Sequence, residues 1–394
     1  MKNTKNELKL NRLQFMLFDV AFSMLFFHNI LVSFSTVPMP TIVQLAMLLI
    51  AFGAFLLFIA KQKLSFKTIV QTAIFVLIGA ITYYFTKKMD LFYISFMLFF
   101  LSFVDEKSFL KVSLRNRIFI VLALFILAKT GLIRDIYITN QSMFQNSSYR
   151  YGCGFKNPNT FGFSLVLISI EAILLMRHAR KKKTIEMIAI ILLALLFIYI
   201  FSGTKTAYII LLIELLIVIM PRRMKNIKSN RIKPYYFLFP VFTLITFLLC
   251  YLYKSQNSFA TLVNDLITNR IDFLNRVSDN YSLKLFGNNI AYSSVSGPNA
   301  QIIICDNLYY YQIFNIGIVA WLIWSFLSFI TFWYLRKRND KYAILLFAVI
   351  LIMGFVENTM SIVFFMPFIL YFAHALRDFL KGGFKNENKA IDKN

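Results

Sequence analysis

Residues 41–60 read TIVQLAMLLIAFGAFLLFIA, a run of 20 residues without a charged side chain. About 20 apolar residues are needed to cross the hydrocarbon core of a bilayer as a helix. This run therefore predicts a transmembrane helix. Similar apolar runs recur on both sides of it, at about 13–34, 67–85, 90–104, 118–133, 159–176, 184–203, 206–220, 235–253, 307–335, 342–356 and 359–376. We predict an all-α polytopic membrane protein with about 12 transmembrane helices.

The composition supports this class. Hydrophobic residues make up 59% of the 394 residues and charged residues only 15%, whereas a soluble domain is about one quarter charged. The 45 Phe and 20 Tyr exceed what one globular core could bury, and a lipid solvent removes that difficulty. The three cysteines have no metal-ligand spacing and imply no disulfide framework. These observations exclude a soluble protein.

The net charge of +24 is distributed as the cytoplasmic loops of a membrane protein require. Lys and Arg cluster in short segments between the apolar runs, and the segments on the side of the N-terminus contain 31 of the 42. Cytoplasmic loops are enriched in Lys and Arg, so we predict both termini inside. No folded basic domain remains to bind a duplex, and we expect no nucleic-acid partner. The first run is too long for a signal-peptide core, so we interpret it as a retained span.

Two predicted outside loops, 134–158 and 254–306, are much longer than the others. Loops longer than about a dozen residues are usually functional. The chain has no internal repeat. We predict one transmembrane domain over 1–376, with a site built from the two long loops at the outer face, and a polar cytoplasmic tail over 377–394.

The first long loop ends in RYGCGFKNPNTFG at 150–162. Its Asn-Pro pair initiates a turn, and Asn159 can cap the helix that follows. A loop-to-helix junction explains these residues, but it does not require the cations at 150 and 156. Cations beside a helix N-terminus form an anion site. The candidate site residues here are Arg150, Lys156, Asn157 and Asn159.

Lys205 is a third outside cation, in the turn SGTKT at 202–206. It is explained equally well as an interfacial lysine whose amine reaches the polar region. The second long loop begins with apolar residues at helical spacing over 259–277. This pattern predicts a helix on the membrane surface, with Asp272 and Arg276 paired one turn apart. Its functional interpretation is that Arg270 and Arg276 point at a lipid-linked phosphate.

Three further polar residues lie where the chain meets the outer membrane face. Asp306 and Asn307 precede LYYY at 308–311, and Glu357 occupies the short turn before the last run. The tyrosines are also explained as an aromatic belt. Asp306 is equally explained as a carboxylate at the mouth of a cavity.

Taken in this order, the motifs resemble those of the bacterial O-antigen polymerase and ligase superfamily, which includes the Wzy-type polysaccharide polymerases. The matching elements are GFKNPNTFG at 154–162, SGTKTA at 202–207, the spacing from Arg276 to Gly287, DNLY at 306–309 with Gly317, and Glu357. The resemblance covers most of the chain and lies in the order of short motifs. The sequence departs from the family at Lys205, where the family often has Arg. Lys keeps the charge but lacks the planar fork for bidentate contact with phosphate.

The resemblance implies a metal-independent glycosyltransferase of the bacterial cytoplasmic membrane, acting on capsule, exopolysaccharide or O-antigen. A polyprenyl-pyrophosphate-linked glycan donates its chain to another lipid-linked repeat unit, with the lipid pyrophosphate as leaving group. The leaving group needs fixed positive charge, and we expect Arg276 and Arg150 to bind the two lipid pyrophosphates. The acceptor hydroxyl needs a general base, for which Asp306 and Glu357 are the alternative candidates. We expect no metal and no cofactor; expected partners are the lipid-linked oligosaccharides, membrane lipid, and assembly proteins such as a flippase and a chain-length regulator.

Several other functional classes are alternatives to a polymerase. Ligases of the superfamily typically have a histidine in the large outside loop, whereas His28, His178 and His374 all lie elsewhere, which favours a polymerase. A flippase or other transporter also has about a dozen helices, but transporters tend to have matched halves, which this sequence lacks. A metal-dependent glycosyltransferase needs acidic residues in its first outside loop, and 35–40 has none. A scaffold protein would not need the outside cations.

Overall fold

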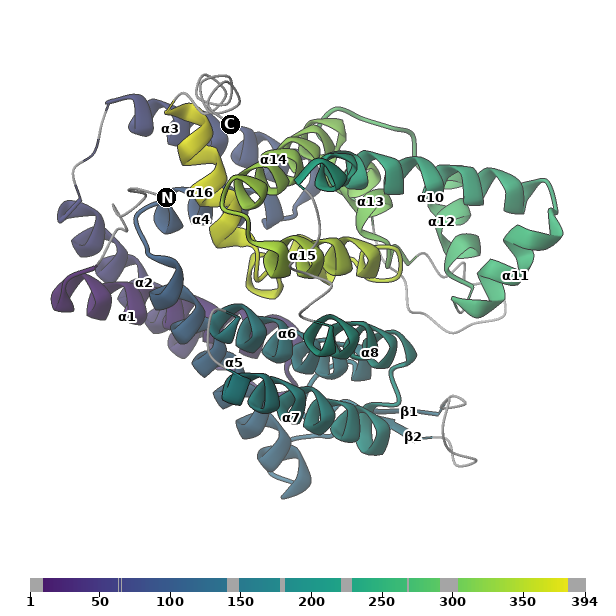
Figure 1. Ribbon diagram of the computed structural model, residues 1–394, viewed down its shortest axis with the longest axis horizontal. Helices are drawn as coiled ribbons and strands as arrows, with labels where there is room; N and C mark the ends of the chain where they lie inside the picture. The colour runs from purple at the N-terminus through teal and green to yellow at the C-terminus, as the bar shows by residue number, and fades with distance from the viewer. Residues whose placement is uncertain are drawn as a thin grey trace. The chain divides into compact units, whose positions relative to one another are not determined.

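The computed structural model describes residues 10–62, 64, 66–139, 149–177, 181–220, 229–267, 269–290 and 304–381, and most of these residues are helical (Figure 1). They form two compact units, one within 1–63 and 103–226 and the other within 64–102 and 227–394. Parts of the two long loops, and the tail from residue 382, lie outside the described residues. The prediction of one domain over 1–376 stays a prediction.

The first unit is a bundle around a buried central helix, α6. Its apolar window is 78% buried, and it packs against α5, α7 and α8. A short antiparallel hairpin of β1 and β2 lies in the first long loop. The elements are α1 (Arg12–Asn29) with a π-helical turn (Ile30–Phe34), α2 (Thr41–Ala60), α5 (Glu106–Lys129), β1 (Tyr137–Thr139), β2 (Tyr149–Tyr151), α6 (Pro158–Met176), α7 (Lys181–Phe197) with a π-helical turn (Ile198–Ser202), and α8 (Lys205–Ile219).

The second unit is organised around α14, which packs against α10, α15 and α16. The helix predicted over 259–277 is present as two short helices, α11 and α12, and its position on the membrane surface stays a prediction. The elements are α3 (Phe66–Thr86), α4 (Asp90–Leu101), a 3₁₀ segment (Ser229–Phe237), α10 (Leu238–Lys254), α11 (Ser258–Leu266), α12 (Arg270–Asn280), α13 (Leu308–Tyr310) with a π-helical turn (Tyr311–Ile316), α14 (Ile318–Lys337), α15 (Lys341–Met353), 3₁₀ turns (Thr359–Ser361 and Val363–Phe365), and α16 (Ile369–Leu380).

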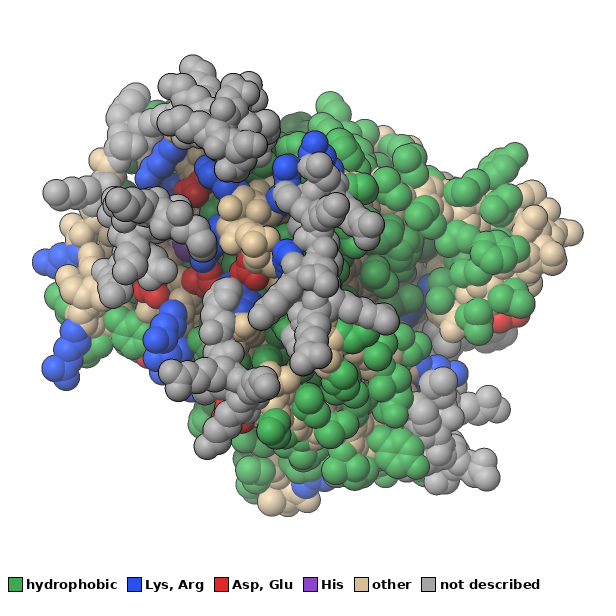
Figure 2. Space-filling model, viewed as in Figure 1, with side chains coloured by type: hydrophobic (Ala, Val, Ile, Leu, Met, Phe, Trp, Pro, Cys, Tyr) green, Lys and Arg blue, Asp and Glu red, His purple; other side chains and the backbone are tan. Residues whose placement is uncertain are grey.

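Within the described residues, seven helices are long and apolar enough to cross a membrane. They are Arg12–Phe34, Thr41–Ala60, Ile69–Thr86, Pro158–Met176, Thr184–Ser202, Lys233–Lys254 and Ile318–Lys337. Large apolar side chains cover much of the surface (Figure 2), and many on these helices are more than half exposed, such as Ile42 at 77% and Leu244 at 70%. The described chain is therefore mostly helical with seven candidate membrane spans, which is consistent with an all-α polytopic membrane protein. The count of 12 spans stays a prediction.

Two predicted runs are not continuous helices. The run at 307–335 breaks at Gly317, whose φ of 114° is outside the helical region. The run at 359–376 consists of two 3₁₀ turns followed by α16, which has only 12 residues. Pro367 explains the second break, because proline forces the preceding residue out of the helical region. Met366 is extended, with φ −108° and ψ 91°.

Within each unit, segments predicted on one side of the membrane meet at one end. In the first unit, Ser35 and Phe155 form a β-bridge, and both belong to predicted outside loops. In the second unit, the Tyr311 hydroxyl donates to Asp90 at 2.6 Å, at the predicted outer end. The predicted alternation of loops therefore fits each unit taken separately. The side that each end faces stays a prediction.

Ionisable residues in the predicted spans of the first unit have polar partners. Glu171 pairs with Arg117 at 3.0 Å, and both side chains are almost fully buried. Asp19 pairs with Arg115, and Ser169 donates to Glu214. Charged groups in apolar surroundings are expensive unless they are paired, so these contacts hold helices of the unit together.

Candidate functional site

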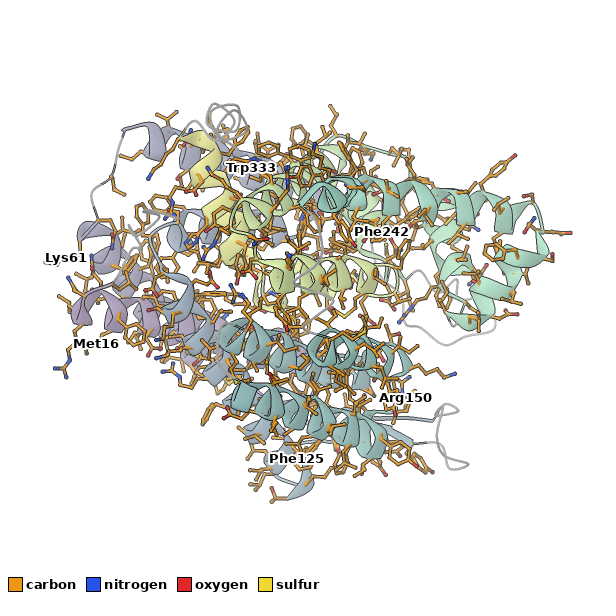
Figure 3. The ribbon with its side chains drawn as sticks, in the orientation of Figure 1. Met16, Lys61, Phe125, Arg150, Phe242 and Trp333 are labelled. Atoms are coloured by element: carbon orange, nitrogen blue, oxygen red, sulfur yellow. The ribbon has the colours of Figure 1, made fainter. Side chains whose placement is uncertain are left out.

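Arg150 connects the two motifs of the first unit, GFKNPNTFG at 154–162 and SGTKTA at 202–207. It lies in β2, and its Nε donates to the Ser202 carbonyl at 3.0 Å. One guanidinium nitrogen donates to Asn159 Oδ1 at 2.5 Å and to Thr204 Oγ1 at 3.3 Å. Figure 3 labels Arg150 beside the hairpin and the start of α8. One side chain therefore holds together the start of α6 and the turn before α8.

Side chains of the 202–204 turn also pack against the backbone of α6. A Cβ placed at Gly162 would lie 3.0 Å from Thr204 Oγ1 and 3.1 Å from Ser202 Oγ. Ser202 Oγ donates to the Pro158 carbonyl at 2.9 Å. A larger residue at 162 would therefore require the Ser202 and Thr204 side chains to shift by a few tenths of an ångström. Ser202 and Thr204 belong to the SGTKT motif at 202–206, but no local pattern in the sequence indicates that they pack against α6.

The first turn of α6 differs from the expectation in one detail. Asn157, and not Asn159, is the N-cap, and its Oδ1 accepts from the Asn159 amide at 2.8 Å. The reason is Pro158, which occupies the first helical position, where its fixed φ and missing N–H are tolerated. The Asn159 side chain is thereby directed to Arg150 instead.

Lys156 and Lys205 occupy different environments. Lys156 Nζ donates to the Val32 carbonyl at 2.9 Å and to the Ser33 carbonyl at 3.2 Å, so it satisfies carbonyls at the end of the first helix. Lys205 is exposed at the start of α8 and has no hydrogen-bond or ion-pair partner among the described residues. Of these two cations, Lys205 is the one available to an anion.

The start of α8 adds partial positive charge. Its N-cap, Thr204, makes no side-chain capping bond, so the amides of the first turn are not satisfied by a capping side chain. Such amides attract anions. With Arg150 bonded to Thr204 and Lys205 as the first helical residue, this end of the first unit concentrates positive charge.

The second unit brings together residues far apart in sequence. Arg270, at the start of α12, lies 3.2 Å from Glu357 Oε1 and 3.8 Å from Asp306 Oδ2. The Arg270 and Glu357 side chains are only 11% and 6% exposed, whereas Asp306 is 38% exposed. The two candidate carboxylates therefore share one arginine, and Asp306 is the more accessible of the two.

Asn307 has a positioning role in this cluster. Its Oδ1 accepts from the Tyr310 amide at 2.9 Å, and its Nδ2 donates to the Phe355 carbonyl at 2.9 Å. Asn358 adds a parallel bond from Nδ2 to the Cys305 carbonyl at 2.6 Å. These bonds tie the segment before α13 to the segment after α15, and thereby fix Asp306 beside Glu357.

Arg276 lies apart from this cluster on α12. It pairs with Asp272 at 2.7 Å, the predicted contact one helical turn away, and 39% of its side chain is exposed. Six residues separate Arg276 from Arg270, which places them about 120° apart around a helix. The two arginines therefore face different sides of α12: Arg270 faces two carboxylates, and Arg276 remains accessible to solvent. The expectation that they point at a lipid-linked phosphate stays a prediction.

The electrostatics of Asp306 suit a general base. Burial raises the pKa of its carboxyl above the usual value, and the Arg270 guanidinium partly offsets this rise. A base works best when its pKa approaches the working pH. Burial therefore moves the pKa of Asp306 towards that range. The exposed part of its side chain remains accessible to a substrate.

The spacing from Arg276 to Gly287 has a packing explanation. Gly287 has φ 80°, and a Cβ there would lie 2.2 Å from the Asn315 carbonyl oxygen. Gly317, with φ 114°, approaches the Gly287 amide equally closely. The carbonyls of Lys284 and Leu285 accept from the first two amides of α14, at 3.1 Å each. The glycines thus let the loop after α12 cap α14.

No group of three or more His, Cys, Asp or Glu side chains suitable for a metal ion occurs in the part of the chain that the structure describes. The three cysteines are buried and free. Comparison of the chain with protein-family models, with curated proteins and with solved structures finds no match.

Proposed function

We propose that the protein is a polymerase of a bacterial surface polysaccharide, such as capsule, exopolysaccharide or O-antigen. It transfers a polyprenyl-pyrophosphate-linked glycan onto another lipid-linked repeat unit at the outer face of the cytoplasmic membrane. The observation that supports this most strongly is the Arg270, Asp306 and Glu357 cluster, in which a partly exposed carboxylate with a raised pKa lies beside a buried ion pair.

In the proposed reaction, the acceptor hydroxyl oxygen attacks the anomeric carbon of the donor glycan. The bond between that carbon and the pyrophosphate oxygen breaks, and the leaving group takes the electron pair. Asp306 accepts the hydroxyl proton. Glu357, which is nearly buried against Arg270, positions the arginine that faces Asp306.

The pyrophosphates require cations that are available to a ligand. Arg276 in the second unit is partly exposed, and Lys205 lies at the uncapped start of α8 in the first unit. Arg150 holds that start in place through Ser202 and Thr204. We assign one lipid pyrophosphate to Arg276 and the other to the Arg150 and Lys205 region. Fixed cations stabilise the charge that develops on the leaving group.

The test measures polymer formation by the purified protein from lipid-linked repeat units. A charge-assisted contact that strengthens as pyrophosphate leaves contributes about 1.5–3 kcal/mol, so Arg150→Ala or Arg276→Ala, whichever removes the contact to the leaving pyrophosphate, should slow transfer by roughly ten- to a hundredfold or more. Asp306→Asn should abolish transfer and largely keep substrate binding. Activity should persist in a chelator.

Matched controls are Arg134→Ala and Lys284→Ala, which remove exposed cations from the two long loops. Both should polymerise at the wild-type rate. Full-length polymer at normal membrane abundance from both Arg150→Ala and Arg276→Ala would contradict the assignment. Transfer to a lipid that is not part of a repeat unit would indicate a ligase instead.

A further inference from the structure

A pocket of about 140 Å³ lies in the second unit between α3, α4 and α16, which the ribbon places beside one another (Figure 1). It is at the end of the unit opposite the Arg270 cluster, formed by the start of α3 and the ends of α4 and α16. This end is the one predicted to be cytoplasmic. The pocket is therefore separate from the proposed polymerase site.

One end of the pocket is cationic. Arg377 and Lys381 lie one turn apart on α16 and both line it. The Arg377 Nη1 donates to the Ser102 carbonyl at 2.7 Å. Its Nε is buried without a hydrogen bond, with an Asp378 oxygen 3.5 Å away. A guanidinium has five N–H donors, so the bond to Ser102 leaves most of them available. Lys381 is exposed and has no partner among the described residues.

The other end of the pocket is apolar. Phe75 and Leu98 line it, with Ala373 one turn deeper along α16 than Arg377. From Ser102 to Ser95 the pocket follows α4 for seven residues, which is about 10 Å of helix. An anion at the mouth and a hydrocarbon chain inside would match this polarity.

We propose that the pocket binds an anionic phospholipid of the cytoplasmic leaflet. The headgroup phosphate contacts Arg377 and Lys381, and part of an acyl chain fills the space beside Phe75, Leu98 and Ala373. Basic pockets between transmembrane helices on the cytoplasmic side suit such headgroups. A role for Arg377 as a cap of carbonyls at the end of α4 accounts for one donor only, and it does not explain the apolar interior.

The experiment counts phosphatidylglycerol bound to the purified full chain by native mass spectrometry in a mild detergent. Each basic residue near a lipid surface contributes ~1 kcal/mol, so Lys381→Gln should weaken binding about fivefold. Arg377→Gln combined with Lys381→Gln should weaken it about thirtyfold. Ala373→Leu, which fills the apolar end without changing charge, should also reduce binding.

The matched control is Lys107→Gln combined with Lys111→Gln, two exposed lysines one turn apart on α5. This variant should bind phosphatidylglycerol as the wild type does, and phosphatidylcholine should bind the wild type more weakly. Unchanged binding by both Lys381→Gln and Ala373→Leu would overturn the proposal. Equal competition by inorganic phosphate would show a site for free phosphate instead of a lipid.

Discussion

Arg270 illustrates how a contact distant in sequence determines what a residue can do. Arg276 is part of the spacing to Gly287 that carries the family resemblance, whereas Arg270 belongs to no such motif. In the structure Arg270 is the buried member, held between Glu357, 87 residues away, and Asp306. No local pattern encodes that pairing. The sequence singled out Arg270, Asp306, Asn307 and Glu357. It did not indicate which arginine contacts which carboxylate.

The Arg270 contact gives a prediction for the dependence of activity on pH. If Asp306 is the base, transfer requires its ionised form, so activity should fall as pH falls through its raised pKa. Arg270→Gln removes the cation that lowers this pKa, so the pKa should rise further. The acid limb of the rate profile should then move to higher pH. Measuring the initial rate of transfer across pH tests this.

The control for this profile is Arg276→Gln. Arg276 pairs with Asp272 rather than with Asp306, so its substitution should lower the rate without moving the acid limb. Equal shifts in both variants would contradict the assignment of Asp306 as the base. Glu357 is the alternative base, and loss of transfer in Glu357→Gln with transfer kept in Asp306→Asn would identify it.

At the scale of elements, apolar periodicity predicted the long helices and missed the breaks. The runs at 41–60 and 159–176 correspond closely to α2 and α6. Hydropathy does not distinguish a helix from a helix interrupted at Gly317, because both are apolar. The break requires a backbone contact with Gly287, 30 residues earlier, and such a contact cannot be inferred from composition.

That backbone contact makes Gly287 a test of the second unit. Gly287→Ala places a Cβ 2.2 Å from the Asn315 carbonyl oxygen at a positive φ, so the loop must move away from the start of α14. Strain of this kind costs ~2 kcal/mol or more. The melting temperature in detergent should fall by about 5 °C or more, as measured by thermal unfolding of the purified protein.

Gly53→Ala is the matched control. Gly53 lies in the middle of α2, and a Cβ there would meet nothing within 4 Å. Alanine is the better helix former by up to ~1 kcal/mol, so this variant should keep or raise the melting temperature. A Gly287→Ala protein as stable as Gly53→Ala would show that the crossing of the two glycines does not hold α14.

At the scale of the whole molecule, the distribution of Lys and Arg and the apolar runs predict the same alternation of inside and outside loops. The contacts within each unit are compatible with this alternation. Each unit has one end where predicted outside segments meet and another where predicted inside segments meet, as at Ser35 with Phe155 and at Ser102 with Arg377. A single misplaced span would put one of these pairs on opposite sides of the membrane. The contacting residues of each pair must lie on the same side of the membrane, so an even number of spans must separate them along the chain.

Cysteine labelling tests this arrangement in both units. The three native cysteines are buried, so a membrane-impermeant maleimide should give little background. Tyr149→Cys and Gln256→Cys introduce thiols at exposed positions of the two long loops, and Lys111→Cys and Asn339→Cys do so at exposed positions predicted inside. On intact cells the first pair should be labelled and the second pair only after permeabilisation. Labelling of Asn339→Cys without permeabilisation, with Gln256→Cys protected, would place the Arg270 cluster in the cytoplasm. Transfer between lipid-linked glycans at the outer face would then be impossible for that cluster.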